Sequence, residues 1–563
     1  MSFHEYAIMY VSSWKRVVVI LFVIWAGTVY LMLSPSRCGL NEDLDIVELT
    51  SLKSQLEELR QNNLRLLAQF KQSGLLSNLD PGSLPFDSGQ GPPVEYEHLR
   101  RRIYSNMKEL WYYLQHELGA AAAGDAGGER LRDILDEAEE RKRSLLSDME
   151  KLPSLDGYQE WREAEAANAS DLVQRRLRYL QNPADCANAR KLVCNLNKGC
   201  GFGCQMHHLV YCLIFAYATE RTLIVNSKGW RYNTKGWDYT FYPLSETCTT
   251  TFDDKVHPWP AQSEAKVISL PYIDSISRKP QFLPLTVPKD LAARVLKFNG
   301  DPAAWWIGQV LKFILRPRPE MQRAINETIA KMNFQRPIVG IHIRRTDKVG
   351  AEAAFHHIHE YMKHVKQYYD KLQLSTDVRA RRVYIATDDP NALSDARSKY
   401  PDYTFHGDPS IAKTAAHRRY TPLSLTGLLV DLQLLSSCDY IVCTFSSQIG
   451  RLAYEMMQAN RADASNSYFT LDDIYYYGGQ NAHNRIAVLP HKGGKHEDIS
   501  FEVGDFIGVA GNHWNGYGRG TNKKTNQDGL IPWYKTADHL VMYAFPEYKQ
   551  VPLYKGQKID PDT

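Results

Sequence analysis

The sequence has little net charge and lacks the common glycine motifs for binding nucleotides. Its 67 Lys and Arg residues nearly balance 64 Asp and Glu residues, which leaves a formal net charge of +3. Without a basic excess, composition gives no support for a nucleic-acid partner. Gly201-Phe202-Gly203 is followed by Met206 where G-x-G-x-x-G requires a third glycine, and no G-x-x-x-x-G-K-[ST] run is present. These absences argue against a dinucleotide-dependent dehydrogenase and a P-loop enzyme.

One apolar run, residues 17–33, has about the length needed to cross a bilayer. No small-residue cleavage site clearly follows it, which favours an uncleaved anchor over a signal peptide. Lys15 and Arg16 precede the run and acidic residues follow it. By the positive-inside rule, residues 1–16 are a cytosolic tail, and the rest of the chain faces a lumen or the outside.

The cysteines fit an oxidising compartment. Six of them lie in one stretch: Cys186, Cys194, Cys200, Cys204, Cys212 and Cys248. Such a set usually forms disulfides, but the spacing alone does not show which cysteines pair. The alternative is zinc, because Cys200, Cys204 and His207 have a tolerable ligand spacing.

Residues 34–182 are predicted to be a helical stem. Apolar residues from Leu49 to Phe70 alternate in steps of three and four, with Asn63 at one core position, which is typical of a dimeric coiled coil. A linker rich in Gly, Pro and Ser follows. Helical spacing then predicts helices near residues 99–118, 130–151 and 160–180.

At 563 residues the chain is too long for one core, and about one domain per 150 residues suggests several units. After the stem, short apolar runs alternate with helical patterns, which predicts an α/β fold with a doubly wound parallel sheet. Residues 183–336 are expected to form an open-sheet α/β region with disulfides, and residues 337–480 a Rossmann-like domain. Short strands divided by turns resemble an SH3 domain over residues 481–545, with a tail at 546–563. Ile531 stands where that domain often has an aromatic residue, so a groove for proline-rich peptides is not expected.

Polar side chains follow three predicted strands of the second sheet. Parallel strands bring their carboxyl ends to one edge, where open α/β sheets bind ligands. Adjacent guanidiniums suit phosphate oxygens, and the start of the helix after the third strand suits a diphosphate. The alternatives to a phosphate site are a surface cluster of ion pairs and, for the two aspartates, either a pair of metal ligands or a helix cap. The residues concerned are Arg344, Arg345, Asp347 and Lys348 after the first strand, Asp388 and Asp389 after the second, and Ser446, Ser447 and Gln448 after the third.

Five motifs resemble the α1,6-fucosyltransferases of animals, which add core fucose to N-glycans. They are IHIRRTDKVG, ATDDP, VCTFSSQ, DDIYYYGGQNAHN and VCNLNKGCGFGCQMHH, and the resemblance runs from about Tyr96 to the SH3-like end. It implies a type II Golgi membrane protein with a coiled-coil dimerisation region, a catalytic α/β region and an SH3 domain. The implied reaction moves fucose from GDP-β-L-fucose to the 6-hydroxyl of the Asn-linked N-acetylglucosamine, with inversion and without a metal or other cofactor.

The resemblance also implies roles for individual residues. Arg344, with Arg345 beside it, matches the arginine that binds the diphosphate, Glu352 the general base, and Lys348 a partner that relays the proton. His342, Tyr232, Asp431, Ser447 and Gln448 match GDP contacts; Asp347, Tyr361, Asp388 and Asp389 match residues tied to activity; Lys198, Asp274 and His513 match acceptor positions. The implied disulfides are Cys186 with Cys248, Cys194 with Cys212, and Cys200 with Cys204.

The sequence departs from the family pattern at two positions. Phe202 stands where a tyrosine is common, and Gly450 replaces a cysteine that would pair with Cys443, for which Cys438 is a guessed substitute. Two other functions remain open: a fucosyltransferase with the same donor and another acceptor, and a membrane-tethered coiled-coil adaptor with an SH3-like end. Product linkage would separate the first from core fucosylation, and the arginine pair argues against the second.

Overall fold

In a computed structural model, the chain divides into two units, Met1–Phe86 and Asp87–Thr563. The structure describes residues 91–123, 128–252, 254–262, 264–346, 350, 353–480, 483–494 and 497–555. The expected membrane anchor and coiled coil therefore lie outside the described residues. Within these ranges, the structure contains no helix with the length and apolar character of a membrane span.

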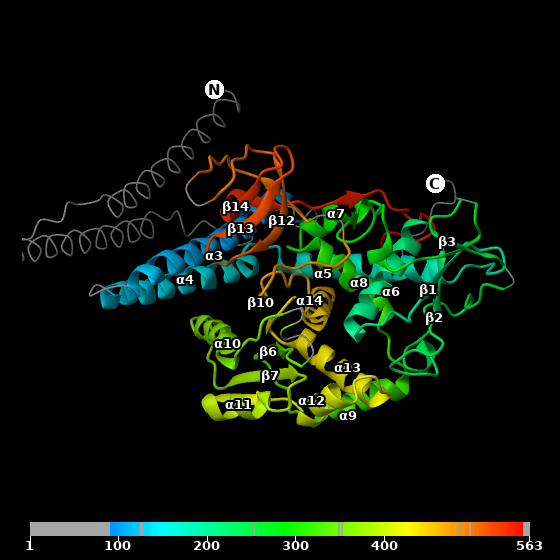
Figure 1. Ribbon diagram of the computed structural model, residues 1–563, viewed down its shortest axis with the longest axis horizontal. Helices are drawn as coiled ribbons and strands as arrows, with labels where there is room; N and C mark the ends of the chain where they lie inside the picture. Colours follow the sequence, from blue (N-terminus) through cyan, green and yellow to red (C-terminus); the bar gives the residue numbers. More distant parts are fainter. Residues whose placement is uncertain are drawn as a thin grey trace, which may run out of the picture. The chain divides into compact units, whose positions relative to one another are not determined.

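The second unit begins with three helices where helical spacing predicts them. They are α3 (Val94–Ala122), α4 (Gly128–Leu155) and α5 (Gln159–Gln181). Helices α3 and α4 run side by side, and the hydroxyl of Tyr104 on α3 donates to Glu150 on α4 at 2.8 Å (Figure 1). Trp111 is buried, with the Lys142 ammonium 4.4 Å from its ring centre. Helix α5 packs on the following sheet region through Leu172, which is fully buried.

A four-stranded parallel sheet follows, in the order β2-β1-β4-β3. Helix α6, apolar on all sides and almost wholly buried, connects its first two strands. The elements of this region are β1 (Lys191–Asn195), α6 (Phe202–Ala218), β2 (Thr222–Asn226), β3 (Val256–Pro258), β4 (Val267–Ser269), β5 (Val287–Pro288), α7 (Lys289–Leu296), α8 (Pro302–Ile314) and α9 (Pro319–Ala330). Three disulfides join Cys186 to Cys248, Cys194 to Cys212 and Cys200 to Cys204, the pairs that the resemblance implies.

The second parallel sheet has five strands in the order β10-β9-β6-β7-β8. Its central strand β6 is buried along its whole length, as the apolar run predicts, and helices cover both faces. The chain reverses its direction of winding between β6 and β9, the switch point at which doubly wound sheets bind ligands. The elements are β6 (Ile338–Ile343), α10 (Ile358–Leu372), β7 (Arg381–Thr387), α11 (Ala392–Lys399), β8 (Tyr403–His406), α12 (Pro409–His417), α13 (Pro422–Ser437), β9 (Tyr440–Cys443), α14 (Gln448–Asn460) and β10 (Tyr468–Thr470).

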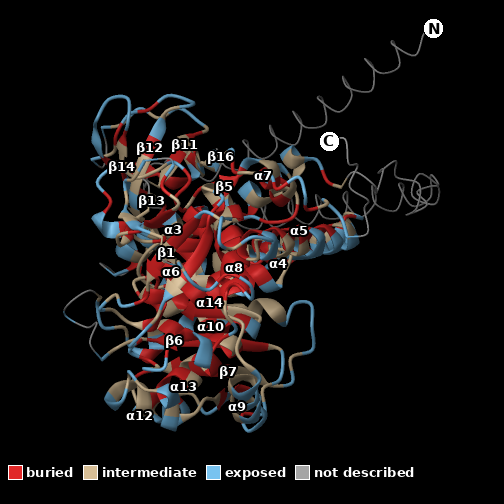
Figure 2. Ribbon diagram, turned by 90° about the vertical axis from the view of Figure 1, so that its right-hand side faces the viewer, coloured by how far each residue is buried: buried red, intermediate tan, exposed pale blue. Residues whose placement is uncertain are grey.

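One buried core continues between the two parallel sheets. Figure 2 shows buried residues running through α6, α8 and α14, which pack on one another. Gly308 of α8 permits this contact, because a Cβ there would lie 2.1 Å from the carbonyl oxygen of Glu455 on α14. The core fixes the distance between the two sheets.

The last region is an antiparallel sheet in the order β14-β13-β12-β11-β15. Its strands are β11 (Asn484–Ala487), β12 (Phe506–Asn512), β13 (Tyr517–Asn522), β14 (Asp528–Pro532) and β15 (Thr536–Asp538), and β16 (Met542–Tyr543) pairs with β5. Trp533 belongs to the small core of this sheet. Trp514 instead packs against Tyr112 of α3 and Phe469 of β10, with ring centres 5.8 and 5.7 Å apart.

Candidate functional site

The arginine pair leaves the sheet at the carboxyl end of β6. Ile343 at the end of β6 stands opposite Thr387 at the end of β7, so the residues after the two strands meet. Arg345 Nη1 lies 2.9 Å from Asp389 Oδ2, and Arg344 forms an ion pair with Asp388. The two guanidiniums therefore gather at the edge of the sheet, as predicted.

Asp388 ties the turn after β6 to the end of β7. Its carboxylate accepts from the backbone N–H groups of Arg345 at 2.9 Å and Thr346 at 3.3 Å, and from the Thr346 hydroxyl at 2.5 Å. Asp389 accepts from the N–H of Asn391 at 2.9 Å as well as from Arg345. Because arginines and backbone donors engage both carboxylates, the geometry assigns the two aspartates to ion pairing with the arginines.

Arg419 is a further arginine at this edge, which sequence reasoning missed. Its Nη2 lies 3.1 Å from Thr346 Oγ1 and 4.0 Å from Asp388 Oδ2. The next residue, Tyr420, has the Arg231 guanidinium 3.5 Å from its ring centre and the ring of Tyr232 at 5.4 Å. This short segment between α12 and α13 thus links the two parallel sheets. Its only signal in the sequence is the basic run His417 to Arg419 ahead of the helix cap Thr421.

His342 and Asp431 belong to the face of the sheet that α13 covers. His342 is 6% exposed, and its Nδ1 has no hydrogen-bond partner within the described part of the chain. Burial, and then the charge of Arg344, lowers the pKa of His342 to about 3, so the ring is neutral. Asp431 accepts a hydrogen bond from the hydroxyl of Tyr384 at 2.6 Å. Burial raises the pKa of Asp431 to about 7, which makes this carboxyl a group that titrates near neutral pH.

The turn after β9 is closed by an aspartate. The backbone N–H groups of Phe445 and Ser446 donate to the carboxylate of Asp472 at 2.7 and 3.1 Å. These two amides are occupied, whereas the first amides of α14 come later, from Gln448 onward, so the expectation that the start of this helix holds a diphosphate stays a prediction. Ser447 is buried at the start of α14, and Oε1 of Gln448 lies 3.0 Å from Nδ1 of His207.

The start of α6 lies against this edge from the first sheet. The N–H of Phe202 donates to the hydroxyl oxygen of Tyr232 at 2.8 Å, and the two rings pack edge to face. Burial raises the pKa of Tyr232 to about 12, so its hydroxyl stays protonated. A Cβ at Gly203 would lie only 2.8 Å from Cβ of Gln448, so α6 approaches α14 closely. Tyr232 and Gln448 are thereby brought to the same helix end.

Two of the predicted acceptor residues meet, and the third lies elsewhere. Lys198 forms an ion pair with Asp274 at 2.6 Å, and its ammonium lies 5.5 Å from the ring centre of Tyr272. His513 is exposed in the antiparallel sheet, where its N–H donates to the carbonyl of Tyr517 at 2.9 Å. Among the described residues, no hydrogen bond or ion pair joins His513 to Lys198 or Asp274.

The remaining predicted residues lie in α10 or outside the described residues. Tyr361 is 2% exposed, and burial raises its pKa well above the usual value. Its ring stands edge to face with His356, whose carbonyl accepts from Arg345 at 2.7 Å. Asp347, Lys348 and Glu352 are outside the described residues.

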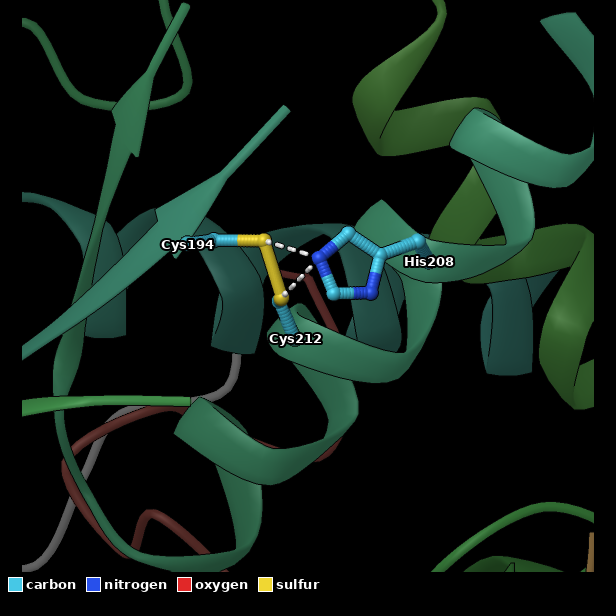
Figure 3. A group of neighbouring side chains, drawn as sticks. All are labelled: Cys194, His208 and Cys212. Carbon is cyan, nitrogen blue, oxygen red and sulfur yellow. Dashed lines mark hydrogen bonds between the residues drawn. A yellow bond between two sulfur atoms is a disulfide. The ribbon is translucent and has the colours of Figure 1, made fainter. Parts of the chain in front are cut away.

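The zinc alternative is wrong, because Cys200 and Cys204 are bonded to one another. A second group, Cys194, His208 and Cys212, has the spatial arrangement of metal ligands, but its sulfurs also form a disulfide (Figure 3). Nε2 of His208 lies 3.6 and 3.8 Å from these sulfurs. Metal ligation requires thiolates, and a disulfide offers none.

The guessed pairing of Cys438 with Cys443 is also wrong, since both are free and buried. Gly450 suits this region sterically. A Cβ at position 450 would lie 2.8 Å from the carbonyl oxygen of Thr444 and 3.2 Å from Cys443 Sγ.

Comparison with known proteins assigns the family. A family model described as alpha-(1,6)-fucosyltransferase N- and catalytic domains matches residues 7–476. An alpha-(1,6)-fucosyltransferase of Drosophila melanogaster is 50% identical over 473 residues, which cover 83% of this chain and 75% of that protein. One from Caenorhabditis elegans is 37% identical over 464 residues, which cover 80% of each chain.

Solved structures of other fucosyltransferases give only a distant likeness. NodZ from Bradyrhizobium is 14% identical with a TM-score of 0.29, and the match covers 47% of this chain and 92% of that one. The apo form of POFUT1 is 14% identical with a TM-score of 0.31, and the match covers 51% and 99%. The family model and the two animal relatives span most of the chain. The chain belongs to the alpha-(1,6)-fucosyltransferase family and is a fucosyltransferase.

Proposed function

We propose that the protein transfers fucose from GDP-β-L-fucose to the 6-hydroxyl of the innermost, Asn-linked N-acetylglucosamine of N-glycans, with inversion at the anomeric carbon. The observation that carries the proposal is the meeting of Arg344, Arg345 and Arg419 at the carboxyl end of β6, the strand that borders the switch point of a doubly wound parallel sheet. That edge is where such sheets bind nucleotides, and guanidiniums match phosphate oxygens. The family membership supplies the sugar and the linkage.

The arginines would stabilise the departing nucleotide. As the acceptor O6 forms a bond to the anomeric carbon, the bond from that carbon to the β-phosphate oxygen breaks, and negative charge grows on the diphosphate. A guanidinium placed at that charge lowers the barrier without a metal ion. Arg344 takes this role, and Arg345 and Arg419 add to the positive potential. Asp388 holds the backbone after β6, so the position of the arginines is set before the donor binds.

Other residues would place the nucleotide and accept the proton. His342, Tyr232, Asp431, Ser447 and Gln448 form the GDP site, with the Asp431 carboxylate accepting from the amino edge of guanine. Glu352 takes the proton of the acceptor hydroxyl, and Lys348 relays it. Tyr361, Asp347, Asp388 and Asp389 support activity. Lys198, Asp274 and His513 bind the acceptor glycan.

The surrounding parts of the chain complete the proposal. Residues 17–33 anchor the protein in the Golgi membrane with its catalytic part in the lumen, and the coiled coil at residues 49–70 makes it a homodimer. The antiparallel sheet is an SH3-like domain. Trp514 packs on Tyr112 and Phe469, so this tryptophan is not the wall of an open peptide groove, which disfavours a role as an adaptor.

The direct test is to incubate the purified protein with GDP-fucose and a trimmed N-glycan and to determine the mass and linkage of the product. We expect one added deoxyhexose, linked α1,6 to the reducing-end N-acetylglucosamine. Fucose on another hydroxyl would support GDP-fucose as the donor but refute the proposed acceptor position. No product from GDP-fucose with any N-glycan would refute the donor as well.

A further inference from the structure

His207 connects α6 to the start of α14 through a closed set of hydrogen bonds. Its Nδ1 lies 3.0 Å from Oε1 of Gln448, and its Nε2 lies 2.9 and 3.1 Å from the two carboxylate oxygens of Glu455. Gln448 and Glu455 are about two turns apart on α14, so both face the imidazole. The hydroxyl of Tyr475 donates to Glu455 Oε1 at 2.7 Å. None of these contacts follows from the sequence motifs.

The side chains around the imidazole present oxygen atoms to both ring nitrogens. Oε1 of Gln448 faces Nδ1 of the ring and the Glu455 carboxylate faces Nε2, and amide and carboxylate oxygens only accept hydrogen bonds. Glu455 is fully buried, and a buried carboxylate is stable when hydrogen-bond donors compensate its charge; the His207 ring and the hydroxyl of Tyr475 contact it. Because Oε1 of Gln448 is turned to His207, its NH₂ group is turned away from the imidazole.

The packing around His207 leaves the ring little freedom. The hydroxyl of Tyr477 donates to the backbone carbonyl of His207, and the two rings are 4.9 Å apart. His207 is 5% exposed. The close approach of Gly203 to Gln448 holds the two helices at a fixed distance.

The first turns of α6 also contact other predicted site residues. The N–H of Phe202 donates to Tyr232, and Nε2 of Gln205 donates to the carbonyl of Lys198 at 2.9 Å. Oε1 of Gln205 accepts from the indole of Trp230 at 2.7 Å. Helix α6 thus contacts two predicted donor-binding residues and one predicted acceptor residue through different side chains or backbone groups.

We propose that His207, together with Glu455, is a positioning residue that holds the amide of Gln448 with its NH₂ group toward the nucleotide of the donor. The inference rests on the proposed function, because it requires Gln448 to contact GDP-fucose. Oxygen atoms of a nucleotide diphosphate accept hydrogen bonds, so an amide held with its NH₂ outward binds them without first losing rotational freedom. His207 itself need not touch the substrate.

The test compares four variants of the full chain, and the double variant combined with Gln448→Ala, in steady-state assays with GDP-fucose, together with calorimetric binding of GDP. His207→Phe keeps an aromatic ring but leaves Glu455 buried without its imidazole partner. The double variant His207→Phe with Glu455→Gln removes the charge of Glu455, which allows the chain to fold without aiming Gln448. Gln448→Ala removes the amide itself. His364→Phe is the matched control, because Nδ1 of His364 also lies 3.0 Å from a glutamine oxygen, that of Gln367, but on α10.

We expect the double variant to melt near the wild-type temperature, yet to raise the KM for GDP-fucose and weaken GDP binding about 3- to 10-fold, the effect of one misplaced neutral hydrogen bond. The turnover number should change less. Adding Gln448→Ala to the double variant should weaken binding no further, because the two changes act through the same contact. The control should bind GDP like the wild type.

Three results would overturn the inference. In the first, the double variant has a wild-type KM for GDP-fucose while Gln448→Ala raises it; Gln448 then binds the donor without His207, and the proposed function stands. In the second, Gln448→Ala has no effect, which removes Gln448 from the proposed donor site as well. In the third, His364→Phe raises the KM equally, which shows that any lost buried histidine has this effect.

Discussion

Replacing Arg344 with lysine tests the role of the arginine pair most directly. Arg344 follows the central strand β6 and pairs with Asp388, whose carboxylate is nearly buried. Lysine keeps the positive charge and reaches a similar distance, but it has no planar fork and cannot bind two phosphate oxygens side by side. The change therefore removes the geometry of the donors while leaving the local charge unaltered.

The size of the effect follows from where the arginine acts. Loss of a donor that stabilises charge in the transition state typically lowers turnover about 10²- to 10³-fold, or about 3–4 kcal/mol. Stability should change much less. Asp388 keeps the N–H groups of Arg345 and Thr346 and the hydroxyl of Thr346, at 2.9, 3.3 and 2.5 Å. With a lysine ammonium still available to it, we expect a cost in unfolding free energy of about 1 kcal/mol.

The assay measures kcat and KM for GDP-fucose at saturating acceptor, together with thermal unfolding. Arg381→Lys is the matched control, because Arg381 pairs with Asp370 at 2.8 Å at the opposite end of β7. We expect the control to retain turnover and Arg344→Lys to lose at least a hundredfold, in the range of the loss of one transition-state donor. Turnover of Arg344→Lys within a few fold of wild type, with an intact fold, would refute the idea that a guanidinium stabilises the leaving diphosphate.

Three further predictions concern protonation and metal ions. The pKa of Asp431 is raised to about 7, so below that pH the carboxyl is protonated and no longer accepts from guanine as an anion. We expect the KM for GDP-fucose to rise as the pH falls from 8 to 6, and we expect Asp431→Asn to remove this dependence. A KM of the wild type that does not change with pH would contradict this prediction. Burial also raises the pKa of Asp301 to about 6; the folded chain binds this proton more tightly than the unfolded chain, so the group lowers stability as pH rises above about 4. Asp301→Asn keeps an oxygen for the N–H of Ala304 but loses the acceptor for the Tyr454 hydroxyl, so the expected result is a loss of this pH dependence: between pH 4 and pH 7.5 the unfolding free energy of the variant should fall less than that of the wild type in denaturant titrations. Activity should persist in EDTA, since arginines rather than a metal ion are proposed to stabilise the leaving diphosphate. A loss of turnover in EDTA that a divalent ion restores would contradict this.

Local patterns predicted much of the second parallel sheet. The run Ile338–Ile343 is the observed β6 at both ends, because six consecutive buried residues between a proline and a charged pair leave little ambiguity. The strand over residues 440–443 is equally clear. Helix α14 is less clear from the sequence: the pattern after the third strand predicts a helix only over residues 451–457, whereas the structure starts it at Gln448, because the serines before it do not reveal which of them is the cap. The edge strand β8 and helix α12 have weak apolar patterns and were not predicted.

At the site, sequence order predicted which strands deliver the polar groups but not how those groups pair. The ion pair between Arg345 and Asp389 depends on the register of β6 against β7. Asp472 occupies the amides after β9 although it follows another strand, and Arg419 reaches Thr346 from a connecting segment. Such contacts join residues far apart in the chain, and only assembly of the second parallel sheet with its connecting segments brings them within hydrogen-bond distance.

The class of fold, the positions of the buried strands and, through the motifs, the family follow from the amino-acid sequence alone. These properties depend on the order of apolar and polar residues over a few turns or one strand, which is local information. Only the tertiary structure shows that Arg344 and Arg345 pair with the aspartates of the next strand, that Cys438 and Cys443 are not bonded to one another, and that His207 contacts Gln448. These contacts depend on which side chains lie next to one another once the core is buried. The separation of two residues along the chain does not show whether they become neighbours.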